Sequence, residues 1–255
     1  MYAEERQQAM VQLIGQQGRV SVAELAANLA VTTETVRRDL SVLERMGLIR
    51  RVHGGAVPAS ALAAIESGIS ERDQDNTEAK DAIAVAALAL LPPPGSMIII
   101  DAGSTTARFA ALLPRDHRLT VVTHAVSVAA RLAGLPHIDL FLLPGRVRTT
   151  THAAVGAETV AALSNIRADV SFLATNGIST TFGLTTPDRD EAATKRALAA
   201  AGRRAVVLAD STKVGVESSL RFAALSEIDV LVTDSGISDD DASALAAADV
   251  EVVIA

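Results

Sequence analysis

The chain is predicted to be an α/β protein, with a winged helix-turn-helix at its N-terminus and a larger α/β domain after it. From Met97 onward, continuous apolar strands alternate with helical segments, which is typical of a mainly parallel sheet covered on both faces. Residues 1–60 carry seven Arg and six Asp/Glu, a net of +1, and the remainder carries −8, which together give the −7 of the whole chain. A locally basic N-terminus on an acidic protein indicates an anionic partner for that part.

Composition narrows the class of protein further. The 255 residues, with 49% hydrophobic content, are enough for one or two domains. The absence of Cys excludes disulfides and thiolate metal sites and suits a cytoplasmic location. The longest apolar run, Ile83 to Leu91, is shorter than the roughly 20 residues that a membrane span needs. We therefore expect a cytoplasmic protein with no signal peptide, no membrane span, no metal and no cofactor.

The first 57 residues contain the elements of a helix-turn-helix. A first helix is expected at Glu4–Gln16, and Ser21 with Glu24 forms the capping-box pattern that begins a short second helix. Thr32 is the expected N-cap of a third helix, Thr33–Met46. Three apolar residues at helical spacing turn one face of this helix inward: Val36, Leu40 and Leu43.

The third helix and a hairpin around Gly54-Gly55 form the candidate DNA-reading edge. Such a helix fits the major groove, where Arg contacts guanine and Thr contacts thymine methyls or phosphates, while Arg on a hairpin can follow the backbone. Adjacent arginines alone are as often a solvated helix face, so the prediction depends on the whole order of elements. Asp39 would repel phosphate, and we expect it to hold an Arg or cap an amide. The candidate DNA-binding residues are Thr32, Thr33, Thr35, Arg37, Arg38, Arg50, Arg51, His53 and Gly54.

A linker is predicted at residues 58–75, because PASALAAIESG is rich in small residues. The expected domains are therefore residues 1–57 for DNA binding and residues 76–255 for the α/β part. A helix from about Asn76 to Leu91 ends at three prolines and Gly95. The strands expected after it are Met97–Ile100, Leu119–Val122, Asp139–Leu143, Val170–Ala174, Arg204–Ala209, Val230–Val232 and Val250–Ile254.

Polar residues gather where these strands end, which is the ligand-binding edge of such sheets. In the turn DAGSTT, Gly103 lets the backbone come close, and the following Ser and Thr offer amides and hydroxyls at a helix N-terminus, which suits phosphate. Ser and Thr are also ordinary helix caps. Lys213 can neutralise a phosphate or pair with Asp210. The candidate effector-binding residues are Asp101, Gly103, Ser104, Thr105, Thr106, Thr123, His124, Gly145, Arg146, Asn176, Gly177, Asp210 and Lys213.

The stretch VTTETVRRDLSVLERMGLIRRVHGGA closely resembles the N-terminal signature of the DeoR family of bacterial transcriptional regulators. DAGSTT, VVTH, LPGR, NGI, DSTK and VTD resemble the effector domain of the same family, with His124 in place of a common Asn. The resemblance implies operator binding by the helix and wing, a fold similar to that of ribose-5-phosphate isomerase, and a phosphorylated sugar as effector. The opening MYAEERQQ resembles the fructose-operon branch, which implies a fructose phosphate. For Arg72, Asn76, Glu78 and Lys80, which nearly match a family run, a ligand role and a surface salt bridge both stay open.

Two functions follow from these observations. The first is a DNA-binding regulator, a repressor of a sugar-metabolism operon, that acts as a homodimer or homotetramer on double-stranded DNA and responds to a phosphorylated sugar. The alternative is a phosphosugar isomerase with an N-terminal helical appendage, for which Asp101, Asp210 and Glu191 are candidate bases. The Gly-rich run that follows the catalytic lysine of such isomerases has no counterpart after Lys213, where the sequence is VGVESS. We therefore predict that the chain is not an enzyme and has no catalytic residues.

Overall fold

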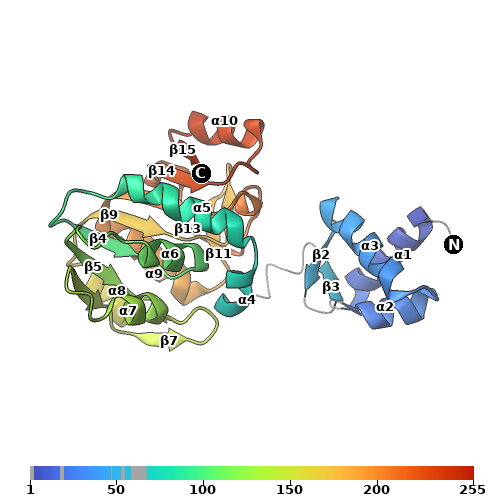
Figure 1. Cartoon of the computed structure of the whole chain (residues 1–255). Helices are drawn as coiled ribbons and strands as arrows, with labels where there is room; N and C mark the ends of the chain where they lie inside the picture. The colour runs from blue at the N-terminus through green and yellow to red at the C-terminus, as the bar shows by residue number, and fades with distance from the viewer. Residues whose placement is uncertain (1–2, 18–19, 47, 53–54, 59–67) are drawn as a thin grey trace. The chain divides into compact units, whose positions relative to one another are not determined.

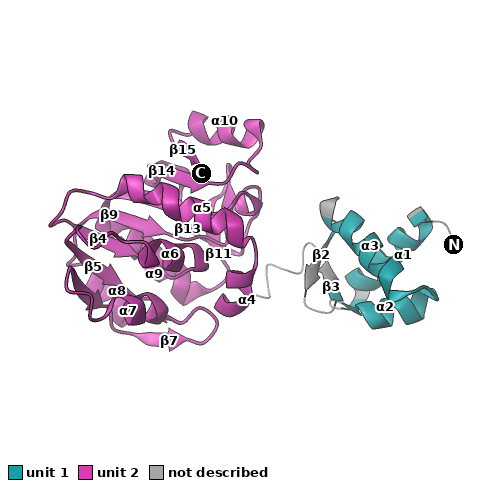
Figure 2. Ribbon diagram, in the orientation of Figure 1, with its two compact units in different colours: residues 1–66 teal, residues 67–255 magenta. Residues whose placement is uncertain are grey.

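The computed structural model describes residues 3–17, 20–46, 48–52, 55–58 and 68–255. The chain divides into two compact units, residues 1–66 and 67–255, each with its own hydrophobic core (Figure 2). The N-terminal unit holds three helices and a small sheet, and the C-terminal unit holds a large sheet with helices (Figure 1). The predicted fold class is confirmed.

The N-terminal unit contains the helices α1 (Ala3–Gln17), α2 (Val22–Leu29) and α3 (Thr33–Arg45). The predicted caps are present: Ser21 and Glu24 form the capping box of α2, and the Thr32 hydroxyl accepts the amide of Thr35 at the start of α3. Both caps satisfy amide groups that a helix start leaves open. The tight connection between α2 and α3 is made by Ala30, which has a left-handed backbone (φ +53°).

Asp39 connects α3 to α1. Its carboxylate is only 4% exposed and accepts Arg6 Nε at 2.6 Å and Gln7 Nε2 at 3.0 Å. Burial would raise the pKa of Asp39, but the hydrogen bonds from Arg6 and Gln7 hold that pKa below its usual value. The expectation that Asp39 holds an arginine is confirmed, and that arginine comes from the first helix.

The wing is an antiparallel sheet in the order β1-β3-β2, made of β1 (Val20–Ser21), β3 (Gly55–Pro58) and β2 (Ile49–Val52). The predicted hairpin is confirmed by the pairing of β2 with β3. The two-residue strand β1 is too short to leave a sequence pattern. His53 and Gly54 lie outside the described residues. The core beneath the wing consists of Met10, Ile14, Val20, Leu25, Val36, Leu40, Leu43, Ile49 and Ala56.

The C-terminal unit is built on a seven-stranded sheet in the order β15-β14-β12-β9-β4-β5-β6, with every neighbouring pair parallel. The chain starts at β4, moves outward through β5 and β6, and then returns to β9 on the other side of β4. The strand order therefore reverses between β4 and β9. The strands are β4 (Met97–Ile100), β5 (Leu119–Thr123), β6 (Ile138–Leu142), β9 (Ala168–Leu173), β12 (Gly202–Leu208), β14 (Val230–Thr233) and β15 (Glu251–Ile254).

Helices cover both faces of this sheet. One core cluster joins Ile98 and Ile100 of β4 to the helices α5 (Thr77–Ala87), α6 (Ser104–Ala111) and α7 (Val126–Leu132). The other joins Ile99 to the helices α8 (Ala157–Leu163), α9 (Arg189–Ala201) and α10 (Asp239–Ala247). Burial on both faces explains why the central strands are purely apolar.

Short elements complete the unit. β7 (Arg146–Arg148) pairs with β8 (Ala153–Val155), and β10 (Gly177–Ser179), β11 (Gly183–Thr186) and β13 (Leu220–Ala223) form a second antiparallel sheet. Single 3₁₀ turns occur at η2 (Leu88–Leu90), η3 (Ser211–Lys213) and η4 (Leu225–Glu227). Strands of three or four residues are too short to show a period of two, which explains why they are absent from the predicted strands.

The structure differs from the predicted linker at its second half. A helix, α4 (Ile69–Gln74), lies within residues 58–75 and belongs to the C-terminal unit. The Ile69 amide donates to the Thr150 carbonyl at 2.8 Å, and Lys80 Nζ donates to the carbonyls of Arg72 and Asp75. Contacts from distant residues order this helix, and the local composition does not reveal them.

Candidate functional site

A pocket lies at the carboxyl ends of β4, β9 and β12, beside the point where the strand order reverses. Residues 103–105 follow β4, and residues 174–176 follow β9. Leu208 is the last residue of β12, and Ala209, Asp210 and Lys213 come after it. Arg72 of the helix α4, Asp75 directly after it and Lys80 of α5 complete the lining. We call this the strand-end pocket. Its position is the usual ligand site of an open parallel sheet.

The turn after β4 forms one wall. A Cβ on Gly103 would lie 2.6 Å from the Cβ of Ala174, so only glycine lets this turn pack against the end of β9. Ser104 and Thr105, which are 9% and 5% exposed, begin α6. The helix has no side-chain cap at its start, which leaves its first amide groups available for an anionic ligand.

The loop after β12 forms the opposite wall. The carboxylate of Asp210 is 2% exposed and accepts Asn76 Nδ2 at 3.0 Å and the hydroxyl of Thr212. Asn76 has a left-handed backbone (φ +49°) at the junction of α4 and α5. The Asn76–Asp210 hydrogen bond therefore joins two segments that are 134 positions apart in the chain and brings Lys80 to the pocket.

Lys80 is the most buried cation that lines the pocket, with 4% exposure. Burial lowers the pKa of Lys80; the nearby Asp210 carboxylate raises it, and the Lys213 ammonium lowers it again. The interpretation of Lys80 as part of a surface salt bridge is wrong, because its side chain is buried. With Arg72, Lys80 and Lys213 against Asp75 and Asp210, the lining carries one formal positive charge in excess, which suits an anion.

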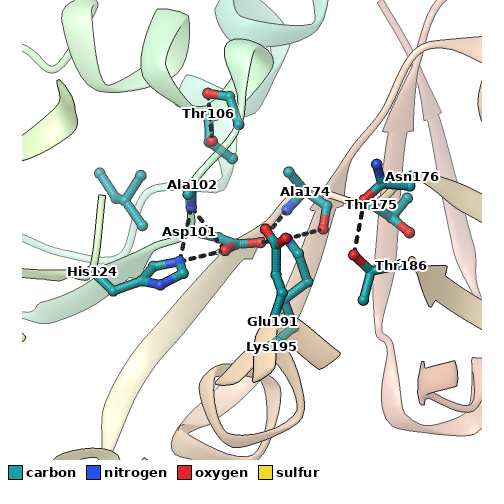
Figure 3. A network of polar contacts seen from close by, with 12 residues as sticks. Asp101, Ala102, Thr106, His124, Ala174, Thr175, Asn176, Thr186, Glu191 and Lys195 are labelled. Carbon is teal, nitrogen blue, oxygen red and sulfur yellow. Dashed lines mark hydrogen bonds and ion pairs between the residues drawn. The ribbon is translucent and has the colours of Figure 1, made fainter. Parts of the chain in front are cut away.

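Below the pocket, Asp101 is fully buried and both of its carboxylate oxygens are occupied (Figure 3). Oδ1 accepts the Ala102 amide at 2.8 Å and lies 2.8 Å from His124 Nε2. Oδ2 accepts the Ala174 amide at 2.9 Å and Lys195 Nζ at 2.5 Å. Burial would raise the pKa of Asp101, but the Lys195 ammonium and the His124 hydrogen bond outweigh it and lower the pKa to about 2.

The carboxylates that an isomerase would need are already engaged. Asp101 is enclosed by its four partners, and Glu191 of α9 is 1% exposed and forms an ion pair with Arg148 of β7. A general base has to lie within hydrogen-bond reach of the proton that it removes. Asp101 and Glu191 are instead fixed parts of the scaffold, and of the three candidate bases only Asp210 lines the pocket.

The structure brings together six of the thirteen candidate effector residues as lining of the pocket: Gly103, Ser104, Thr105, Asn176, Asp210 and Lys213. Four others are fully buried and bond to the backbone or to one another, and they do not line it: Asp101, Thr106, Thr123 and His124. Gly145, Arg146 and Gly177 lie elsewhere. Arg146 pairs with Asp190 at 2.8 Å, and a Cβ on Gly145 would lie 2.2 Å from Thr159 Oγ1.

The predicted effector-binding residues do not include Arg72, Asp75 and Lys80, although the near match to a family run keeps a ligand role open for Arg72 and Lys80. A signal for Lys80 was present, because the chain has only three lysines, at positions 80, 195 and 213. Lys80 and Lys213 line the strand-end pocket, and Lys195 holds the carboxylate beneath it. All three lysines of the chain thus lie in the strand-end pocket or directly beneath it.

The candidate DNA-binding surface is the outer face of α3. Arg37, Arg38, Thr32 and Thr33 are exposed, and Thr35 is half-buried. Arg37 Nη1 lies 3.5 Å from the exposed Glu34 carboxylate, an arrangement that contributes little stability and leaves the guanidinium accessible. Arg50 and Arg51 belong to β2, whereas His53 and Gly54 lie outside the described residues.

Two further findings concern the described part of the chain. No helix within it is long and apolar enough to cross a membrane. Nor do three His, Asp or Glu side chains within it come together in a way that could hold a metal ion.

The comparisons with known proteins cover both units. The model of the DeoR-like helix-turn-helix domain matches residues 6–61, and that of the DeoR C terminal sensor domain matches residues 75–235. The HTH-type transcriptional regulator GlpR of Haloferax volcanii is 35% identical over 99% of this chain and 98% of its own length. The uncharacterized HTH-type transcriptional regulator FruR of Bacillus subtilis is 36% identical over 92% of both. The glycerol-3-phosphate regulon repressor of Escherichia coli is 31% identical over 91% and 90%.

Among solved structures, ribose 5-phosphate isomerase A of Methanocaldococcus jannaschii aligns over 55% of each chain, with 17% identity and a TM-score of 0.41. The β subunit of eIF2B from Chaetomium thermophilum aligns over 61% of this chain and 48% of its own, with 14% identity and a TM-score of 0.43.

The buried pair of Asp101 and Lys195 leads to a stability prediction. Lys195→Met removes the ammonium and leaves an enclosed carboxylate, so the C-terminal unit should lose about 3–5 kcal/mol of unfolding free energy at pH 7. The pKa of Asp101 is about 2, below its usual value near 4, so the stabilisation is present above about pH 4 and disappears as pH falls toward 2. Denaturant unfolding of both proteins at pH 7 and below pH 4 measures this difference.

The matched control is Arg196→Met on the same helix, where an exposed guanidinium donates to the Arg221 carbonyl. It should cost less than about 1 kcal/mol at both pH values. A Lys195→Met variant as stable as this control at neutral pH would show that the buried pair does not hold the unit together.

Proposed function

Because the chain belongs to the DeoR family of transcriptional regulators, we propose that it represses a sugar-metabolism operon and is controlled by a phosphorylated sugar that binds the strand-end pocket. The observation that carries the proposal is the pocket itself. Three cations, Arg72, Lys80 and Lys213, line it beside the open start of α6. Backbone amides at a helix start together with ammonium groups suit a phosphate dianion. The chain is a regulator and not an isomerase. In keeping with this, two of the candidate bases, Asp101 and Glu191, are already paired with other side chains.

The reader of this regulator is the N-terminal unit. The 13 residues of α3 give a helix about 20 Å long, which fits a major groove, and they expose Arg37 and Arg38 side by side. The ion pair between Arg6 and Asp39 neutralises the carboxylate that directly follows these arginines in the chain. A single unit of this size covers one half-site. A homodimer or homotetramer in the cytoplasm is therefore part of the proposal.

A fructose phosphate is the first effector to test, because the opening residues resemble the fructose-operon branch and one relative is named FruR. Another relative is named for the glycerol-3-phosphate regulon. The panel is therefore fructose 1-phosphate, fructose 6-phosphate and glycerol 3-phosphate, with the unphosphorylated compounds as controls. All of the phosphorylated compounds share the dianion that the pocket suits.

Arg37→Ala and Arg38→Ala should each weaken operator binding by about 1–3 kcal/mol, because a guanidinium contact to base or phosphate is lost. The duplex is selected from a random library with the wild-type protein, and affinity is measured at several salt concentrations. Arg131→Ala, an exposed arginine of α7 in the other unit, is the matched control and should bind like wild type. Wild-type affinity in both α3 variants would exclude this face as the reading surface.

Lys213→Ala should reduce the stabilisation that a bound sugar phosphate gives, without weakening operator binding, since one ammonium that faces the phosphate is removed. The chain's three lysines allow a direct measurement: isotope labelling of lysine Cε gives three side-chain signals. A phosphorylated ligand should move the signals of Lys80 and Lys213, and the unphosphorylated sugars should not. If a compound stabilises the protein and leaves both signals in place, it binds somewhere other than the strand-end pocket.

A further inference from the structure

The helix α4 cannot hold its own position. It has six residues, none of them buried, and its N-cap, Gly68, makes no side-chain hydrogen bond. Isolated helices of this length are unstable in water. The place of α4 is therefore set by the groups of the C-terminal unit that contact it, and any change in those groups is expected to move it.

Arg108 of α6 is the strongest of these groups. Its Nη2 donates to the backbone carbonyl of Asp73 at 2.8 Å and to the Asp73 carboxylate at 2.9 Å, and its Nη1 donates to the carboxylate of Asp81 in α5 at 2.7 Å. The guanidinium side chain is 21% exposed. This Arg108 bridge fastens α4 to α5 and α6 with charge-assisted bonds in a fixed planar geometry.

A second group, Lys80 of α5, holds the same C-terminal end of α4 and also lines the strand-end pocket. Lys80 Nζ donates to the carbonyls of Arg72 and Asp75, the last turn of α4 and the residue after it. An ammonium has three N–H donors, and two of them are used here. An anion that binds Lys80 draws on the same charge as those two carbonyls, so pocket occupancy and the position of α4 are coupled.

The two cavities that border α4 in the described part of the chain differ in size. The strand-end pocket encloses ≈ 50 Å³, whereas pockets that bind small ligands usually enclose about 300–1,000 Å³. A second cavity of ≈ 450 Å³ adjoins it at Ser104 and is lined on one side by Ile69, Ser70 and Asp73. Because Arg72 lines the first cavity and Asp73 the second, a shift of α4 into the larger space widens the smaller one.

We propose that α4 is the element that carries effector occupancy to the N-terminal unit, and that Arg108 is the residue that positions it. A sugar phosphate engages Lys80 and Arg72, and α4 moves toward the larger cavity against the Arg108 bridge. The chain enters α4 directly from residues 58–67, so this displacement acts on the connection to the DNA-binding unit. The inference rests on the proposed effector site and adds the route by which that site controls DNA binding.

The test is Arg108→Met, which keeps the length of the side chain and removes the bridge. The ligand is whichever of fructose 1-phosphate, fructose 6-phosphate and glycerol 3-phosphate stabilises the wild-type protein most. The variant should still bind it, seen as movement of the Lys80 and Lys213 signals. Because the bridge defines the position of α4 that the ligand changes, the effect of the ligand on operator affinity should fall by about tenfold or more without it. Amide hydrogen exchange in residues 69–74 should be faster than in wild type even without ligand.

Two further variants make the outcome decisive. Asp73→Asn weakens only the α4 end of the bridge and should show a smaller loss of the same response. Arg131 lines the same ≈ 450 Å³ cavity as Arg108, and the described residues provide it with no hydrogen bond or ion pair. Arg131→Met should therefore respond like wild type. A full operator response in Arg108→Met and Asp73→Asn overturns the role of α4. If the wild-type protein binds no compound of the panel, the proposed effector is wrong. In that case the positioning role of Arg108 is still tested without ligand, by comparing amide exchange at residues 69–74 in Arg108→Met and in wild type.

Discussion

The C-terminal unit depends on one buried charge. Asp101 ends β4 at the centre of the sheet, where an unpaired carboxylate would cost several kcal/mol. The groups that compensate it come from four places: the amides of Ala102 and Ala174, the imidazole of His124 after β5, and the ammonium of Lys195 on α9. All of these groups have to keep their positions around the carboxylate for the charge to remain buried. Lys195 also donates to the Ala174 carbonyl at 2.9 Å, so the ends of β4 and β9 are fixed to each other.

This constraint shapes the strand-end pocket above it. With Ala174 fixed to Asp101, the turn at Gly103 packs so closely that no Cβ fits between them. The floor of the pocket is therefore rigid, and its walls differ in how firmly the rest of the unit holds them. The walls after β4 and β9 belong to the sheet, whereas the wall with Arg72 and Asp75 is formed by the end of α4, a helix with no buried residue. On our proposal, a ligand larger than the enclosed ≈ 50 Å³ displaces the wall formed by α4, the helix that follows residues 58–67.

The sequence predicts the frame of this protein well and its site only in part. Strands buried on both faces leave unbroken apolar runs, and caps such as Ser21 and Thr32 act locally, so both can be recognised without a structure. The carboxyl edge of the sheet is also predictable, but the direction of each side chain at that edge is not. Asp101 turns down into the sheet and Ser104 faces the pocket, although they are three residues apart. Lys80 reaches the pocket through the Asn76–Asp210 contact, which joins distant positions, and no local pattern encodes it.

The division between arginine and lysine follows from what each cation has to do. The reader exposes Arg37 and Arg38, whose planar guanidinium groups can form paired hydrogen bonds with a base edge. The effector side needs a cation that can share its donors between protein and ligand, and Lys80 already contacts two carbonyls of the α4 segment from a buried position that lowers its pKa. A guanidinium is larger, planar and always charged, so it would fix that geometry. An ammonium with three donors around a point charge can exchange a carbonyl for a phosphate oxygen with little rearrangement. In the proposed mechanism, lysine at position 80 lets the pocket bind an anion and release a helix with the same group.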